Sequence, residues 1–229
     1  MIEALHLRKR YGRHTVLRGF SLQAHPNEVT LLVGANGAGK TTSLRILAGL
    51  ARPDDGEARI CGFNLRQRRR AQARLSFLPQ GVHFHPRLSC RHLLRFYSRL
   101  RRARHKRVEE LLELTGLHDE ADKPAGKLSG GLRQRLGLAV LLLPDVPVLL
   151  LDEPGLSLDP HWRERLQSLV RHEAGRGRTI LIATHMLAEW NGVADRCLLC
   201  DDGCITAELD PDNLRDSLST RQLNRFAAA

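Results

Sequence analysis

Aromatic residues and long apolar runs are scarce in this chain of 229 residues. Phe, Trp and Tyr together make up only 4% of it, so aliphatic side chains must fill most of any core. The chain contains no run of about 18 consecutive apolar residues, which excludes an ordinary membrane-spanning helix. The N-terminal residues MIEALHLRKR lack the apolar segment of a secretory signal peptide. We therefore expect a chain without a membrane span of its own.

Cysteine is also scarce, with five residues, which is an odd number. In a chain without a signal peptide, this count indicates a reducing cytosol and free thiols. Hydrophobic residues make up 42% and charged residues 27%, which is typical of a globular protein. This composition excludes collagen, low-complexity sequence and wholesale disorder.

Lysine is scarce among the basic residues, and one stretch lacks acidic residues altogether. Only five of the 36 basic residues are Lys, and the formal net charge is +11. Residues 66–107 contain 13 Arg and one Lys but no Asp or Glu, so the whole positive excess lies there. Such an excess indicates a nucleic acid, an anionic membrane surface or an acidic partner. An Arg-rich composition inherited from a GC-biased genome is the ordinary alternative.

Both ends of the chain have the pattern of an α/β fold. An alternating segment at 2–7 and an apolar run at 28–33 precede a glycine-rich loop and a helical pattern at 40–50. Continuous apolar runs at 148–151 and 179–183 are typical of strands buried on both faces. A helix is expected between these two runs, and Asp201-Asp202-Gly203 later indicates a β-hairpin.

The middle of the chain has helical patterns instead. A helix is expected over 89–104, with these inward residues: Leu93, Leu94, Tyr97 and Leu100. Four arginines of this segment are expected to line one outer face: Arg91, Arg95, Arg99 and Arg102. A second helix is expected to end near Gly116 and a third to span 132–143. We predict one domain, 1–229, with a helical subdomain inserted at about 85–145 and a polar tail at about 212–229.

A phosphate-binding loop is the strongest motif. The segment GANGAGKT matches G-x-x-x-x-G-K-[ST], and it has the required strand before it and helix after it. Its glycines let successive N–H groups point at phosphate oxygens, Lys40 can reach the β- and γ-phosphates, and the Thr41 hydroxyl can bind Mg²⁺. The expected binding residues are Gly34, Ala35, Asn36, Gly37, Ala38, Gly39, Lys40, Thr41 and Thr42. A plain glycine-rich turn is the alternative.

Two carboxylates, Asp152 and Glu153, follow the buried strand pattern at 148–151. Open α/β sheets bind ligands at the carboxyl ends of their strands. Asp152 can hold Mg²⁺, and Glu153 can polarise or deprotonate an attacking water. The alternative is a strand that simply ends in a polar turn.

The segment Leu128-Ser129-Gly130-Gly131, just ahead of the acidic strand, resembles the signature of the ATP-binding subunits of ABC transporters. The resemblance covers roughly residues 2–215. It implies a P-loop NTPase core with an N-terminal antiparallel β subdomain and an α-helical insertion. It also implies that Ser129, Gly130 and Gly131 contact the γ-phosphate held by a second subunit, with Ser129 near a helix N-cap.

Other motifs fall in the order of the family. Tyr11 resembles the aromatic residue that stacks on adenine, and Gln80 resembles the glutamine that senses Mg²⁺ and the attacking water. Asp159 belongs to a segment that resembles the loop lining the dimer interface, and His185 resembles the switch histidine on the γ-phosphate. Two positions depart from the common pattern without removing a ligand or a base: Leu132 and Gly155.

The resemblance implies a head-to-tail pair of nucleotide domains that closes on two ATP molecules and reopens after hydrolysis. It assigns catalytic roles to Lys40, Gln80, Glu153 and His185, and Mg²⁺ binding to Thr41, Gln80 and Asp152. The expected cofactors are ATP and Mg²⁺. The expected partners are a transmembrane permease subunit and a second copy of the nucleotide-binding subunit, at the cytoplasmic face of the inner membrane. No nucleic-acid partner is expected.

Within the family, the chain resembles ABC-2-type exporters, including the ATPase of nitrous oxide reductase maturation. Its short length also suits the haem exporter of cytochrome c biogenesis. The arginine face of residues 91–102 is interpreted as a surface for the membrane subunit or the membrane, with a solvated face as the alternative. The competing function is a non-transport ABC ATPase acting on nucleic acid or ribosomes. Such proteins usually carry a second nucleotide domain, a long coiled coil or zinc modules, which this sequence lacks.

Two clusters outside these motifs have metal-ligand spacing. The first is formed by Cys197, Cys200 and Cys204, but the hairpin pattern puts Cys197 and Cys200 on opposite faces of a buried strand. Small buried hydrophobic side chains are therefore favoured over a metal site. The second is His83 and His85, for which a solvated loop is favoured.

Overall fold

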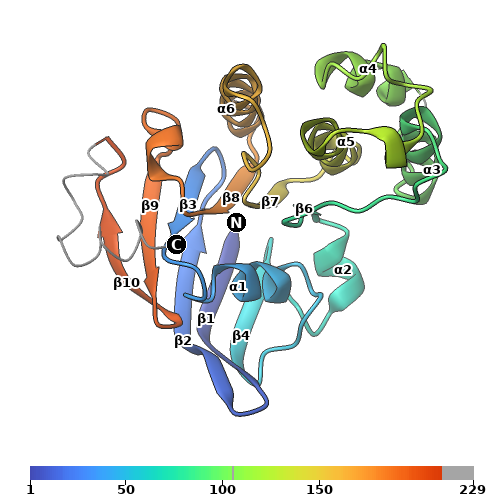
Figure 1. Cartoon of the computed structure of the whole chain (residues 1–229). Helices are drawn as coiled ribbons and strands as arrows, with labels where there is room; N and C mark the ends of the chain where they lie inside the picture. Colours follow the sequence, from blue (N-terminus) through green and yellow to red (C-terminus); the bar gives the residue numbers. More distant parts are fainter. Residues whose placement is uncertain (105, 213–229) are drawn as a thin grey trace.

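The computed structural model describes residues 1–104 and 106–212, and two β-sheets organise this part of the chain (Figure 1). The smaller sheet is antiparallel, with the order β2-β1-β4-β5. Its strands are β1 (Ile2–Tyr11), β2 (His14–Ala24), β4 (Asp55–Ile60) and β5 (Phe63–Asn64). It forms the N-terminal antiparallel β subdomain that was expected from the sequence.

The larger sheet has the order β10-β9-β3-β8-β7-β6 and is parallel except for the β9–β10 hairpin. Its strands are β3 (Val29–Val33), β6 (Leu75–Leu78), β7 (Val148–Asp152), β8 (Thr179–Thr184), β9 (Arg196–Asp201) and β10 (Cys204–Leu209). The hairpin turns at Asp202 and Gly203, which both have positive φ, as the Asp-Asp-Gly signal predicts.

Helices pack around the larger sheet. They are α1 (Lys40–Leu47), α2 (Arg68–Gln72), α3 (Cys90–Leu100), α4 (Lys106–Leu114), α5 (Gly130–Leu142) and α6 (Pro160–Gly175), with the 3-10 turns η1 (Ala125–Lys127) and η2 (Leu187–Trp190). Figure 1 shows α3, α4 and α5 gathered at the β6 end of the sheet. None of the helices in the described residues is long and apolar enough to cross a bilayer.

Burial on both faces explains the continuous apolar strands of the larger sheet. Every residue of β3, β7 and β8 is buried. Successive side chains alternate between two cores, so Leu31 packs with α5 and α6 whereas Leu32 packs with α1 and the smaller sheet. The carboxyl ends of β3, β7 and β8 therefore meet at one edge of a rigid sheet, where the polar motifs follow.

The predicted arginine face of α3 is confirmed only in part, because Arg91, Arg95 and Arg99 lie in the helix but Arg102 does not. The helix ends at Leu100, so Arg102, which has φ +53°, lies outside it. Arg91 forms ion pairs with Glu109 of α4 and with Asp122, and Arg95 Nη2 lies 3.8 Å from Glu109 Oε1. Arg91 and Arg95 therefore share one carboxylate of the neighbouring helix α4, and both keep part of their side chains exposed. A pattern read from one helix could not reveal this pairing.

The outward face of α3 is instead partly apolar. Leu100, which was expected to point inward, is 65% exposed, and Phe96 is 58% exposed. Leu93 and Leu94 are buried as predicted, and Arg99 is exposed. The expected polar tail begins at the last described residue, Asp212, and the rest of it lies outside the described residues.

No group of three or more His, Cys, Asp or Glu side chains among the described residues could hold a metal ion. Cys197 and Cys200 are buried in different cores, on opposite faces of β9, so their thiols cannot share one ion. Burial raises the pKa of each of these two thiols to about 12. The prediction of small buried hydrophobic side chains is confirmed for both residues. His83 and His85 are exposed in the irregular segment between β6 and α3.

Candidate active site

The phosphate loop joins β3 to α1, and its glycines are required by contacts as well as by conformation. Gly37 and Gly39 have φ values of +83° and +105°, which favour glycine. A Cβ on Gly34 would lie 2.2 Å from the carbonyl oxygen of Cys200. The β9–β10 hairpin thus lies directly against the loop.

The hairpin also bonds to the loop. The Ala38 carbonyl accepts a hydrogen bond from the Gly203 N–H at 3.1 Å and one from the Cys200 thiol at 3.1 Å. These bonds hold a carbonyl away from the phosphate side of the loop. Cys200 and Gly203 were not expected from the sequence as residues of the site, because no local pattern connects a hairpin to a loop so far away.

Lys40 follows the glycines of the phosphate loop, and its side chain folds back to bond with the loop backbone. Its Nζ donates hydrogen bonds to the Gly34 carbonyl at 2.6 Å and the Ala35 carbonyl at 3.1 Å, and the residue is buried. Burial lowers the pKa of the Lys40 ammonium, and the nearby Glu153 carboxylate opposes that shift. A buried cation at the mouth of a loop of N–H donors is a receptor for an anion such as phosphate.

Asp152 and Thr41 meet at the end of β7. The Thr41 hydroxyl donates to Asp152 Oδ1 at 3.2 Å, whereas the buried Oδ2 has no hydrogen-bond partner among the described residues. Burial raises the pKa of the Asp152 carboxyl, and the hydrogen bond from Thr41 opposes the shift. A hydroxyl beside an unpartnered carboxylate oxygen is a hard oxygen donor set, which fits Mg²⁺.

Glu153 is held by β8 on the other side. Its Oε1 lies 2.8 Å from His185 Nδ1, and its Oε2 accepts a hydrogen bond from Thr184 Oγ1 at 3.2 Å. Its backbone has φ +49°, a conformation that non-glycine residues seldom adopt and that the surrounding structure must enforce. Thr184 was missed in the sequence, although it is the residue just before His185.

A cavity of about 350 Å³ brings these elements together. It is lined by Val16, Asn36, Gly37, Ala38, Gly39, Lys40, Thr41, Thr42, Gln80 and Glu153. The structure therefore places Gln80 and Glu153 opposite the phosphate loop. Tyr11 does not line the cavity: its ring is half-exposed at the end of β1, with Lys9 Nζ 5.3 Å from the ring centroid.

The remaining predicted residues lie on another surface. Ser129 caps α5 by accepting a hydrogen bond from Leu132 N at 3.2 Å, and Gly130 and Gly131 pack against Ser157. Asp159 caps α6 in the same way, with Trp162 N at 2.9 Å. Ser129 is exposed, and none of these residues lines the phosphate-loop cavity.

Residues 17–155 match the protein family described as ABC transporter. The chain belongs to the ABC transporter family. This membership confirms the prediction that the protein is an ATP-binding and ATP-hydrolysing subunit of this family. The alternative of an ABC ATPase that acts on nucleic acid or ribosomes gains no support from the relatives described next.

Several ABC proteins are similar to this chain along most of its length. Nod factor export ATP-binding protein I of Burkholderia lata is 38% identical over 221 residues, which cover 94% of this chain and 73% of that protein. Daunorubicin resistance ATP-binding protein DrrA2 of Streptomyces coeruleorubidus is 39% identical, and the match covers 94% of this chain and 68% of that protein. The resemblance to ABC-2-type exporters is consistent with these matches.

Solved structures support the ABC fold. The ATP-binding subunit of an ABC transporter superposes with a TM-score of 0.87 at 24% identity, covering 100% of this chain and 98% of that chain. A dimeric bacterial ABC transporter cassette has a TM-score of 0.85 at 24% identity, and the match covers 92% of this chain and 99% of that chain. The predicted fold class is therefore confirmed.

Proposed function

We propose that this ABC subunit powers export through a separate transmembrane subunit, working as one half of a pair of nucleotide-binding subunits. The relatives described above have export or drug resistance in their names. The observation that carries the ATPase proposal is the position of Glu153, which faces the phosphate loop in one cavity while His185 and Thr184 hold its carboxylate.

ATP binding is assigned to the phosphate loop and Lys40. In this proposal the Lys40 ammonium exchanges the carbonyls of Gly34 and Ala35 for the β- and γ-phosphates. Thr41, Asp152 and Gln80 hold Mg²⁺, which neutralises charge on the phosphates when it is bound. The unpartnered Asp152 oxygen supports this assignment.

Glu153 is proposed as the general base for the attacking water. Its carboxylate needs a fixed direction to accept a proton, and two hydrogen-bonding groups at the end of β8 provide it. When ATP is bound, His185 is proposed to donate a hydrogen bond to the γ-phosphate, which would weaken its hydrogen bond with Glu153. Tyr11 is proposed to stack on adenine, because its ring is exposed and its strand pairs with β2, whose Val16 lines the phosphate-loop cavity.

A second copy of the chain is proposed to complete the site. The N-terminus of α5 presents Ser129 and the N–H groups of Gly130 and Gly131 away from this chain's own cavity. Exposed N–H groups at a helix N-terminus suit an anion, so a γ-phosphate held by the other copy is the proposed ligand. Asp159, which caps the neighbouring α6, is proposed to line the same interface.

The membrane subunit is proposed to bind the outward face of α3. Phe96 and Leu100 are exposed on this helix, and Leu88 lies just before it with 39% exposure. Large apolar side chains that are clustered in the open usually mark an interaction surface. This proposal replaces the arginine face expected from the sequence, and it implies a location at the cytoplasmic side of the membrane.

Affinity purification of the tagged chain from detergent-solubilised native membranes tests this function. We expect a multi-span membrane protein to copurify, and we expect Phe96→Asp with Leu100→Asp to weaken its recovery at least about tenfold, the loss given by roughly 1.4 kcal/mol. Leu50→Asp is the control, since Leu50 is 61% exposed but distant in sequence from α3. Equal recovery with both variants would contradict the proposed surface.

A further inference from the structure

A second cavity, of about 840 Å³, lies near the amino ends of β7 and β8. The phosphate loop, by contrast, follows the carboxyl end of β3. The second cavity is bounded by residues 101–104 after α3, by the start of α4 and by the segments that precede β7 and β8. Its polar lining consists of Arg101, Arg102, Arg104, Lys106, Arg107, Glu110, Asp145, Arg176 and Arg178. Seven of these side chains are basic and two are acidic, which is an unusual concentration of charge in one hollow.

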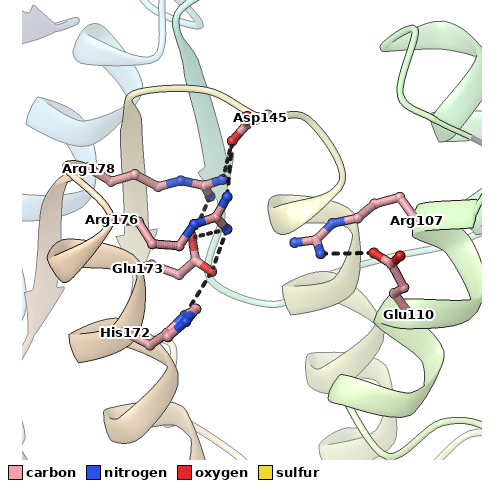
Figure 2. Close-up of polar contacts among 7 residues, drawn as sticks. All are labelled: Arg107, Glu110, Asp145, His172, Glu173, Arg176 and Arg178. Atoms are coloured by element: carbon pink, nitrogen blue, oxygen red, sulfur yellow. Dashed lines mark hydrogen bonds and ion pairs between the residues drawn. The ribbon is translucent and has the colours of Figure 1, made fainter.

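One wall of this cavity is already neutralised (Figure 2). Glu173 is buried and shared by two arginines, with Oε2 at 3.0 Å from Arg178 Nη1 and Oε1 at 3.3 Å from Arg176 Nη1. The exposed Asp145 carboxylate lies 2.7 Å from Arg178 Nη2 and 3.8 Å from Arg176 Nη2. Two carboxylates thus balance two guanidinium groups, and Arg178 itself is buried.

The facing wall is neutralised only at Arg107. Figure 2 shows Arg107 of α4 across from this cluster, paired with Glu110 at 3.3 Å. Arg101, Arg102, Arg104 and Lys106 form no ion pair within the part of the chain that the structure describes, although Arg101 Nη2 is fixed by the Leu75 carbonyl at 2.8 Å. Lys106 and Arg107 also begin α4, the helix end where the backbone dipole disfavours cations. An anion in the cavity would reduce the repulsion among these cations and the repulsion between the cations and the N-terminus of α4.

We propose that this cavity binds a ligand with clustered phosphate groups. Planar guanidinium groups pair with phosphate oxygens two at a time, and four uncompensated cations within six residues suit several phosphates rather than one carboxylate. The volume is that of a small-molecule site. Among the described residues, the lining contains no Phe, Tyr or Trp on which a base could stack, which disfavours single-stranded nucleic acid.

The site is separate from the nucleotide cavity and independent of the proposed export function. It lies before β7 begins at Val148, whereas Glu153 follows the other end of that strand. The two ends of a strand of this length are roughly 13 Å apart. No residue of the described ranges lines both cavities.

Asp145 allows a second test, in which a substitution should strengthen phosphate binding rather than weaken it. Its exposed carboxylate occupies the donors of Arg176 and Arg178 that a phosphate would use, so it competes with the ligand. Asp145→Asn should therefore strengthen binding, and Arg178 keeps Glu173 as its partner in that variant. A merely structural ion-pair cluster would only lose stability with this change.

The test titrates the full chain with tripolyphosphate at about 0.15 M salt, with the nucleotide site filled by MgADP. We expect saturable binding that weakens at least about tenfold in a variant combining Arg102→Ser, Arg104→Ser and Lys106→Ser, and strengthens in Asp145→Asn. The control combines Arg66→Ser, Arg69→Ser and Arg70→Ser, which removes the same charge from exposed positions elsewhere in the basic stretch. We expect its affinity to change less than about twofold.

A second arm identifies the source of the phosphate. The same variants are sedimented with vesicles of phosphatidylglycerol and phosphatidylcholine. Vesicle binding that is lost only in the cavity variant, with weak tripolyphosphate binding, supports a lipid headgroup, whereas the converse supports a soluble ligand. Absence of saturable binding in both arms, or equal weakening in the cavity and control variants, overturns the proposal.

Discussion

The imidazole Nδ1 of His185 lies 2.8 Å from the carboxylate Oε1 of Glu153. The two residues come from neighbouring strand ends, since Glu153 follows β7 and His185 follows β8. Because β7 and β8 pair in parallel register from Val148 with Thr179 to Asp152 with Ala183, this distance is set by the sheet. The pair is therefore positioned before any substrate arrives.

Replacing Glu153 by Gln removes the proposed base but keeps a side chain of the same size. We expect steady-state ATP hydrolysis to fall by about 10²–10⁴-fold, the usual contribution of a general base, while ATP still binds. Nucleotide binding by fluorescence and dimer formation by light scattering are measured in parallel. Near-normal turnover in the purified complex would refute the role given to Glu153.

Thr184 is expected to position Glu153 rather than to react. Its hydroxyl donates to Glu153 and also accepts the Met186 N–H at 3.0 Å. Thr184→Val should lower kcat about tenfold with little change in KM, because a loss in alignment affects the transition state more than binding. Thr184→Ser restores the hydroxyl and should recover most of kcat. A similar loss in both variants would point to packing of the methyl group instead.

The Asp152 carboxylate is expected to lower the free energy of unfolding of the nucleotide-free protein at neutral pH. Burial raises the pKa of this carboxyl, so the folded protein holds the proton more tightly than the unfolded chain, whose pKa is near 3.8. The protonated carboxyl therefore stabilises the folded protein at low pH, and this stabilisation is lost as the pH rises through the raised pKa. Asp152→Asn should therefore raise Tm at pH 7 by about 2–4 °C, the shift that roughly 1 kcal/mol produces in a chain of this size.

MgATP should raise the Tm of the wild type much more than that of Asp152→Asn. Ligand binding stabilises the wild type, whereas Asp152→Asn lacks the anionic metal ligand and should gain little. Differential scanning calorimetry with and without MgATP measures both effects. A variant with lower Tm than the wild type, without nucleotide at pH 7, would contradict the burial argument.

Gly34→Ala is expected to separate the loop from the hairpin. The added Cβ would meet the Cys200 carbonyl oxygen at 2.2 Å, and neither atom can move without its backbone. We expect a loss of about 1–3 kcal/mol in the free energy of unfolding, together with weaker ATP binding. Gly175→Ala is the matched control, because its Cβ would meet nothing within 4 Å at the end of α6. Urea unfolding and nucleotide titration distinguish the two variants.

Local motifs predicted the positions of the phosphate loop, Asp152 and Ser129 because each motif has a short-range cause. The phosphate loop needs its glycines within one turn, Asp152 needs a buried strand before it, and Ser129 caps the helix that begins at the next residue. The structure places these residues where the patterns indicated. What Tyr11, Ser129 and Asp159 contact in a working assembly stays a prediction.

The errors arose where a side chain meets a partner from another element. Arg91 and Arg95 looked solvent-facing from the spacing of one helix, but Glu109 lies on the helix packed beside them. The helix ends at Leu100 rather than at residue 104, and this last helical residue is 65% exposed although the apolar spacing predicts an inward side chain. Thr184 and Cys200 were missed because their importance depends on strand pairing and on a hairpin far along the chain.

The contact between Ala38 and Cys200 spans 162 residues of sequence. β3, which carries the phosphate loop, likewise pairs on both sides with strands made late, β8 and β9. During synthesis, the loop would leave the ribosome long before the segments that shape it. Nucleotide affinity should therefore develop only when nearly the whole described chain is available, so that a prematurely terminated subunit cannot capture ATP or compete for a place in the assembly.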